Sequence, residues 1–180
     1  MNPILEKSLA QFADFGNRLS EQLAALSEAE LNRKPDAKTW SAAEILQHLM
    51  QVHDQYRPRL EPLRDSAHRP NFASRLGLGA GFFGKMLKGV THPKGTRKTQ
   101  TLRQFRPTQS HFSSDIVPTF REHTEQFAEL LRQIPEDRYD ENISSPAGTW
   151  VVLPVRDVVQ LLGNHLERHY HQVQRILAAE

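Results

Sequence analysis

With 180 residues, of which 38% are hydrophobic and 24% charged, the chain has the composition of an ordinary soluble protein and can bury a core without cross-links. The absence of cysteine excludes disulfides, thiolate zinc sites and a cysteine nucleophile, so a bound metal must use nitrogen or oxygen ligands. The length predicts a single domain over residues 1–180, and the lack of disulfides, of a signal-like start and of a long apolar run predicts a cytoplasmic protein, while the net charge is only +2.

Four segments carry apolar residues at the three- and four-residue steps typical of amphipathic helices. They extend over about 3–31, 41–57, 116–134 and 154–178. In the second segment, Ser41 and Glu44 have the spacing of a capping box, and Trp40 and Ile45 occupy the hydrophobic-staple positions. Pro58 is expected to end this helix.

Strand patterns are weak in this sequence. The one short β-prone run, 149–153, follows Gly148, which favours a turn over a sheet. The chain is therefore predicted to be all-α, a four-helix bundle with a long crossover, residues 63–109, between helices 2 and 3. A crossover of this length permits a bundle in which neighbouring helices are not all antiparallel.

The crossover is basic and rich in glycine. No acidic residue occurs from Ser66 to Ser114, whereas this stretch holds nine Lys and Arg residues, and the part 72–90 is both apolar and basic. Such a segment attracts an anionic partner. Contact of 72–90 with a membrane surface is a weaker alternative. Nucleic acid is disfavoured, because neither a recognition helix nor interleaved stacking aromatics are present.

Three histidines lie on apolar stripes of predicted helices. His165 and His169 are four residues apart, so their rings project from one face of the last helix and are able to chelate one ion. His48, on the apolar face of the second helix, is the best third ligand. A lone histidine there would more often be a hydrogen-bonded core residue, but two buried imidazoles one turn apart are hard to explain by packing. The three residues therefore predict a metal centre.

Other polar residues are weighed against this centre. Gln172 returns to the inner stripe, where it would contact a ligand, a substrate or only a buried polar network. His123 is a reserve ligand or supporting residue, and Glu44 is either the capping partner of Ser41 alone or also a support for His48. Glu167 does not directly follow His165, so the metalloprotease motif is absent. The remaining histidines are expected at the surface or in loops: His53, His68, His92, His111 and His171.

The motif Trp40-Ser41-x-x-Glu44-Ile45-Leu46-x-His48-Leu49, followed far downstream by His165-x-x-x-His169-x-x-Gln172, resembles the DinB-like superfamily. The resemblance implies a four-helix bundle with a crossover after the second helix, and a divalent metal, most commonly zinc or nickel, held by His48, His165 and His169. It further implies a metal-dependent hydrolase or a thiol S-transferase that uses a low-molecular-weight thiol, and often a homodimer. The glycine-rich stretch 72–90 departs from the family pattern.

These observations favour an enzyme that acts on a small-molecule substrate with a water or thiol activated by the metal. No separate catalytic residue is identified, because no general base lies near the three histidines in the sequence pattern. The alternative is a non-catalytic, metal-containing binding module whose basic crossover contacts an anionic partner. A purely structural metal site would call for a fourth protein ligand, and only three good candidates are present.

Overall fold

Four long helices form the body of the structure, a computed structural model that describes residues 3–65 and 101–179. The helices are α1 Pro3–Leu23, α3 Ala42–Leu60, α6 Ile116–Arg132 and α7 Val155–Ala178. Their apolar sides meet in a shared core, in which Phe12, Phe120 and Phe127 are fully buried. The predicted all-α, four-helix bundle is confirmed.

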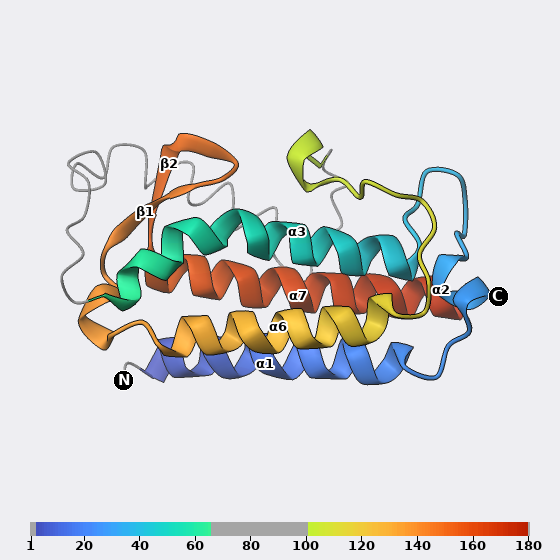
Figure 1. The fold of residues 1–180 in the computed structure, drawn as a ribbon, viewed down its shortest axis with the longest axis horizontal. Helices are drawn as coiled ribbons and strands as arrows, with labels where there is room; N and C mark the ends of the chain where they lie inside the picture. The colour runs from blue at the N-terminus through green and yellow to red at the C-terminus, as the bar shows by residue number, and fades with distance from the viewer. Residues whose placement is uncertain (1–2, 66–100, 180) are drawn as a thin grey trace.

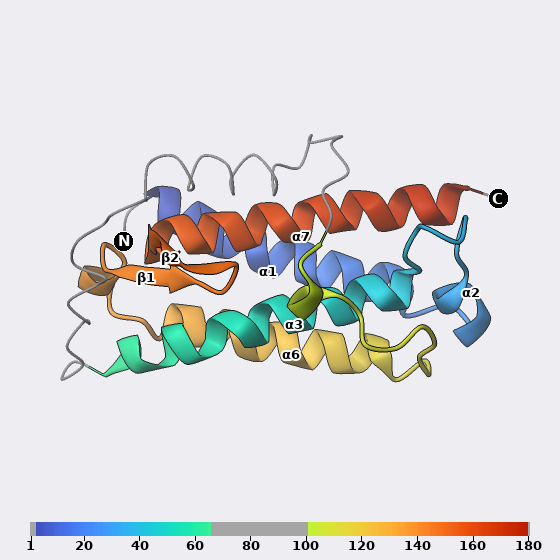
Figure 2. The same cartoon turned by 90° about the horizontal axis from the view of Figure 1, so that it is seen from above.

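The helices do not alternate in direction around the bundle. In Figure 1, α1 and α7 run one way, whereas α3 and α6 run the other way. α1 lies beside α7 and α6, and α3 lies beside the same two helices, as Figure 2 shows from above. Two neighbouring pairs, α1/α7 and α3/α6, are therefore parallel. Because α3 and α6 are parallel neighbours, the chain must return along the length of the bundle between the end of α3 and the start of α6. The long crossover predicted from the sequence accounts for this return.

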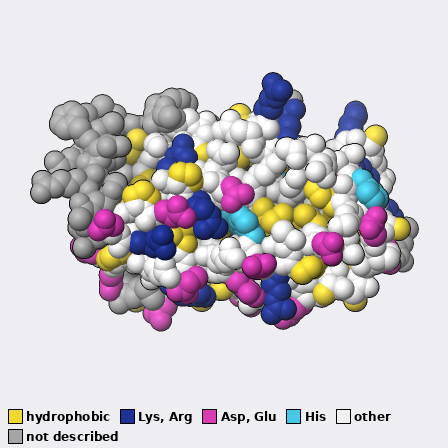
Figure 3. Space-filling model, viewed as in Figure 1, with side chains coloured by type: hydrophobic (Ala, Val, Ile, Leu, Met, Phe, Trp, Pro, Cys, Tyr) yellow, Lys and Arg dark blue, Asp and Glu magenta, His cyan; other side chains and the backbone are white. Residues whose placement is uncertain are grey.

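The described ends of the crossover are two short 3-10 helices, η1 Glu61–Arg64 and η2 Arg103–Phe105. Its middle, residues 66–100, lies outside the described residues, and so does the predicted apolar and basic stretch 72–90. Among the described residues, no helix is both long and apolar enough to cross a membrane. Figure 3 shows acidic and basic side chains intermixed over the face of the bundle seen in Figure 1.

The prediction of one continuous helix over 3–31 is wrong. α1 ends at Leu23, and a separate short helix, α2 Glu28–Asn32, follows. Ser27 caps α2 in a capping box, in which its backbone N–H donates to the Glu30 carboxylate at 2.7 Å. This Ser-x-x-Glu pattern starts a new helix, and it was readable in the sequence as such a signal.

α3 begins as predicted but ends later. The Ser41–Glu44 capping box is present at its start. Pro58 lies inside the helix, which continues to Leu60 and then into η1. An interior proline costs about 3 kcal/mol. Leu60 and Leu63 are both almost fully buried, and at about 1.5–3 kcal/mol each their burial offsets that cost.

A β-hairpin precedes α7, which corrects the expectation that residues after Gly148 form only a turn. β1 Asn142–Ser145 pairs antiparallel with β2 Gly148–Pro154. β2 was missed because its apolar residues are consecutive: Val151, Val152 and Leu153 are all buried. The sequence therefore lacks the alternation of apolar and polar residues by which half-buried strands are recognised. The hairpin packs on α3, where the Tyr56 and Ser145 hydroxyl oxygens are 3.3 Å apart.

Candidate metal centre

Three histidine side chains meet between α3 and α7. Nε2 of His165 lies 3.3 Å from Nε2 of His48 and 3.1 Å from Nε2 of His169. The rings stand edge to face, with interplanar angles of 66° to 84°. Among the described residues, this is the group of three possible ligands whose donor atoms all lie within 4.8 Å of one another. We call His48, His165 and His169 the convergent cluster.

The helices place these side chains for simple reasons. His165 and His169 are one turn apart on α7, so they project from the same face. α3 packs antiparallel to α7, which brings His48 across from that face. The capping box at Ser41 sets where α3 starts, and His48 follows in the second turn. The ring of Trp40, just before the cap, lies 5.0 Å from the ring of His48 and covers one side of it.

A backbone carbonyl from the crossover holds the His48 ring. Nδ1–H of His48 donates to the carbonyl oxygen of Phe105 in η2 at 2.6 Å. In a neutral ring with Nδ1 protonated, Nε2 carries a free lone pair. This nitrogen is the one that faces His165, as expected for a metal ligand whose other nitrogen is held by an outer partner.

All three imidazoles are held in the neutral form. Burial lowers the pKa of His48 to about 4, although the hydrogen bond to Phe105 acts in the opposite direction. Burial also lowers the pKa of His165 and of His169 well below the ordinary value, and the neighbouring rings add to this effect. Neutral imidazole is the form that binds metal ions.

The spacing of the cluster suits a first-row divalent cation. Bonds of about 2.0–2.1 Å from zinc to imidazole nitrogen imply nitrogens roughly 3.3–3.4 Å apart at tetrahedral angles and roughly 2.9 Å apart at right angles. The observed separations of 3.1 and 3.3 Å lie within this range. With three nitrogen ligands, such a cation keeps at least one position for water or substrate.

Gln172 lies one turn beyond His169 on α7. Its side chain raises the pKa of His169 slightly against the larger effect of burial. Nδ1 of His169 is buried and has no hydrogen-bond partner of ordinary length among the described residues. Gln172 is close enough to His169 to affect its pKa and is therefore the candidate acceptor for this nitrogen.

Two other predicted supporting residues are used elsewhere. The Glu44 carboxylate accepts from the Ser41 backbone N–H at 2.8 Å and from Lys34 Nζ at 2.7 Å, so its oxygens serve the cap and an ion pair. His123 lies on α6, where its Nε2 is 2.8 Å from the Asp54 carboxylate. Neither side chain belongs to the convergent cluster.

His53 corrects a further expectation, because it is buried in the core and not at the surface. Its ring stacks on His123, with centroids 5.6 Å apart and planes 18° apart, and on Phe127. Neither ring nitrogen of His53 has a hydrogen-bond partner among the described residues. We call His53 and His123 the stacked pair. Of the other histidines expected at the surface, His111 is exposed, as predicted.

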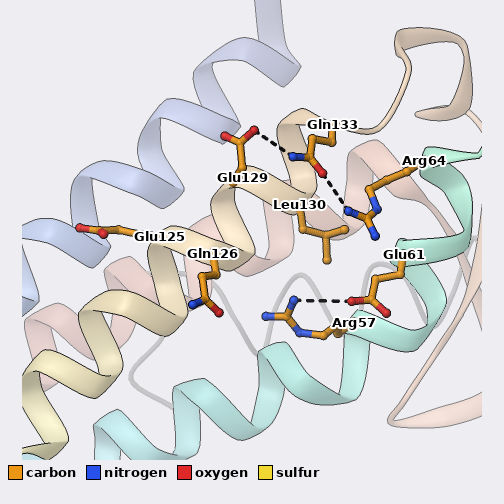
Figure 4. Close-up of a pocket in the computed structure, with 8 residues that line it drawn as sticks. All are labelled: Arg57, Glu61, Arg64, Glu125, Gln126, Glu129, Leu130 and Gln133. Carbon is orange, nitrogen blue, oxygen red and sulfur yellow. Dashed lines mark hydrogen bonds and ion pairs between the residues drawn. The ribbon is translucent and has the colours of Figure 1, made fainter.

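A surface hollow lies away from these histidines. Its volume is about 400 Å³, and it lies between α3 with η1 and α6 (Figure 4). Arg57 pairs with Glu61 at 3.7 Å, and Arg64 donates to the Gln133 side-chain oxygen at 2.9 Å. Because these charged groups already have partners within the hollow, the convergent cluster remains the candidate site for chemistry.

Comparison with known proteins agrees with this arrangement. The family model described as the DinB superfamily matches residues 11–173, which is most of the chain. The chain belongs to the DinB superfamily. The search of curated proteins found no match.

A solved structure shares the fold. It is that of YfiT from Bacillus subtilis, described as "a probable metal-dependent hydrolase with an unusual four-helix bundle topology". The TM-score is 0.59, and the match covers 96% of this chain and 85% of that chain. At 12% sequence identity, the likeness shows the fold alone.

The sequence did not indicate every residue around the cluster. Phe105 contributes a backbone carbonyl, which has no side-chain signature, and η2 was not expected. Trp40 was identified as a hydrophobic-staple residue and as part of the family motif, but not as a side chain whose ring lies beside His48. The three ligand candidates themselves are brought together as the sequence predicted.

Proposed function

We propose that this chain is a divalent-metal-dependent enzyme in which His48, His165 and His169 are the protein ligands and zinc or nickel is the metal. The observation that carries the proposal is the convergence of three neutral histidines, in which Nε2 of His165 lies 3.3 Å from Nε2 of His48 and 3.1 Å from Nε2 of His169. Membership of the DinB superfamily and the description of YfiT as a probable metal-dependent hydrolase support it.

A divalent cation in this position supplies a Lewis acid that makes water or a thiol a usable nucleophile near neutral pH. The protein's own part is to keep the imidazoles neutral, to orient them and to limit the access of water. We infer a small-molecule substrate and either hydrolysis or transfer of a low-molecular-weight thiol. Arg103 and Arg106 flank Phe105 and are exposed, which favours a partner that carries carboxylates.

Metal analysis tests the site directly. The purified protein should hold about one zinc or nickel ion per chain, and His48→Ala, His165→Ala and His169→Ala should each lose it. The loss should exceed the roughly 10–100-fold reduction in affinity typical of changes to outer partners. His123→Ala is the matched control, because its ring binds Asp54 instead. Full occupancy in all three cluster variants would overturn the proposal.

Activity assays separate the two reactions. An ester or amide panel tests hydrolysis, and an electrophile mixed with a carboxylate-bearing thiol tests transfer. The expected result is turnover that requires the metal, disappears with a chelator and returns when zinc or nickel is added back. In transfer, thiol and electrophile are consumed one for one. Turnover that persists in the metal-free protein would contradict a metal-dependent mechanism.

A further inference from the structure

The last part of the crossover, residues 101–108, passes beside the convergent cluster and is held by side-chain hydrogen bonds to α3 and to the β-hairpin. We call it the strap. On one side, the Gln47 side chain binds Thr108 twice: its Nε2 donates to Thr108 Oγ1 at 2.9 Å, and its Oε1 accepts from the Thr108 backbone N–H at 2.8 Å. On the other side, Gln104 Nε2 donates to the Pro146 carbonyl at the hairpin turn, at 2.6 Å.

Between these two anchors lies the carbonyl of Phe105, which accepts the Nδ1–H of His48 at 2.6 Å. A neutral imidazole has two tautomers, and the hydrogen bond of one nitrogen decides which of them is present. Without an acceptor at Nδ1, part of the population would carry its proton on Nε2. That proton would point at His165 and block the lone pair required for a metal.

We propose that Gln47 and Gln104 are positioning residues for the metal centre, which act by holding the strap so that the Phe105 carbonyl sets the tautomer and orientation of His48. The inference rests on the proposed function as far as the metal is concerned. Its first consequence, the tautomer of His48, is independent of any metal.

The arrangement has a structural reason. Gln47 precedes His48 on α3, so its side chain leaves the helix about 100° away from that of His48. It therefore cannot face the cluster, and it reaches the strap instead. Gln104 precedes Phe105 in the same manner and reaches the hairpin. Gln47 thus ties the strap to α3, and Gln104 ties the strap to the hairpin, so the Phe105 carbonyl that holds His48 is fixed from two sides.

The test uses the double variant Gln47→Ala/Gln104→Ala in the full chain. In the metal-free protein, the ¹⁵N chemical shifts of His48 should show Nδ1–H in the wild type and a mixture of tautomers in the variant. Zinc affinity, measured at fixed pH by competition with a chromophoric chelator, should fall about 10–100-fold, the loss typical when an outer partner of a ligand is removed.

Controls distinguish positioning from a general loss of structure. Gln133→Ala, which removes the bond to Arg64 at the far hollow, should change neither the tautomer nor the affinity. Gln47→Glu keeps the acceptor for the Thr108 N–H and should retain most of the affinity. If the double variant does not fold, Thr108→Val and Gln104→Ala replace it, because each removes one exposed hydrogen bond only.

The outcomes differ for the two proposals. A double variant with wild-type tautomer, or with mixed tautomers but unchanged zinc affinity, would overturn the positioning role. A wild-type protein that binds neither zinc nor nickel would overturn the proposed function, whereas the ¹⁵N measurement would still decide whether the strap sets the His48 tautomer.

Discussion

Two groups of buried or half-buried histidines lie in the same bundle, and they differ in where their nitrogens point. In the convergent cluster, Nε2 of His165 lies within 3.3 Å of Nε2 of both His48 and His169, and the His48 ring is held by a carbonyl at its other nitrogen. In the stacked pair, the rings lie nearly parallel, 5.6 Å apart, so their nitrogens do not share a point. Burial alone therefore does not identify a metal ligand.

The same difference appears in the surroundings of the two groups. His53 lies among aromatic rings, with Phe12 at 5.1 Å and Phe127 at 4.8 Å between centroids, and neither nitrogen has a described partner. His123 uses Nε2 for an exposed carboxylate. His53 therefore behaves as part of the hydrophobic core, whereas the convergent cluster brings the ring nitrogens of three histidines together between α3 and α7.

The largest expected effect is a zinc-dependent rise in thermal stability that only the convergent cluster produces. A ligand at about 100 times its Kd stabilises the folded state by about 2.7 kcal/mol. For a chain of this size, that corresponds to roughly 5–10 °C in Tm. His169→Ala should lose this rise and His53→Leu should keep it, as measured by thermal unfolding with and without zinc. Loss of the rise in His53→Leu as well would break the distinction between the two groups.

The second effect concerns pH and is tested at His53 alone. Burial lowers the pKa of His53 well below its ordinary value, and the neighbouring His123 adds to this shift. The unfolded ring has a pKa of about 6.5. Below that pH, the unfolded chain binds a proton that the folded chain does not bind. The stability contributed by the neutral ring is therefore complete above about pH 6.5 and is lost as the pH falls, by about 1.4 kcal/mol per pH unit.

His53→Leu should remove this contribution. Urea unfolding of the metal-free protein at pH 7.5, 6.5 and 5.5 should show a shallower loss of stability in the variant than in the wild type. His111→Leu is the control, because that ring is exposed. An equal slope in the wild type and His53→Leu would show that His53 does not remain neutral in the core. The acid sensitivity would then belong to other groups.

How far the sequence predicts the two groups follows from the periodicity of helices. His165 and His169 share a face because they are four residues apart, and His48 lies on an apolar stripe, so the convergent cluster was predictable. His53 lies about 140° around α3 from His48, but it is four residues after the buried Leu49 and three residues before the buried Tyr56. The periodic apolar pattern was therefore a usable signal that this side of the helix is covered, and it was not used.

Local signals predicted helix starts better than helix ends. The capping boxes at Ser41 and Ser27 are readable in the sequence, although the second was absorbed into a longer helix. The continuation of α3 through Pro58 was not readable, because the burial of Leu60 outweighs the local cost of the proline. The Phe105 carbonyl is the hardest case, since any residue has one and only the path of the crossover brings it to His48.

The smallest expected effect concerns Gln172 and compares Nδ1 of His169 with the ring nitrogens of His53. Nδ1 of His169 is buried without a partner of ordinary length, as both nitrogens of His53 are, but His169 has Gln172 beside it. Metal binding at Nε2 makes Nδ1–H a stronger donor, so a hydrogen bond from Nδ1–H to an acceptor should stabilise the metal-bound form.

Gln172→Ala should weaken zinc binding about 10-fold, the lower end for an outer partner, because α7 still holds His169 in place. Gln174→Ala, which removes a bond to the Tyr170 hydroxyl on the same helix, should leave the affinity unchanged. Equal zinc affinities for wild type and Gln172→Ala would mean that His169 binds without an acceptor, so that the direction of Nε2 alone separates a ligand from a core histidine.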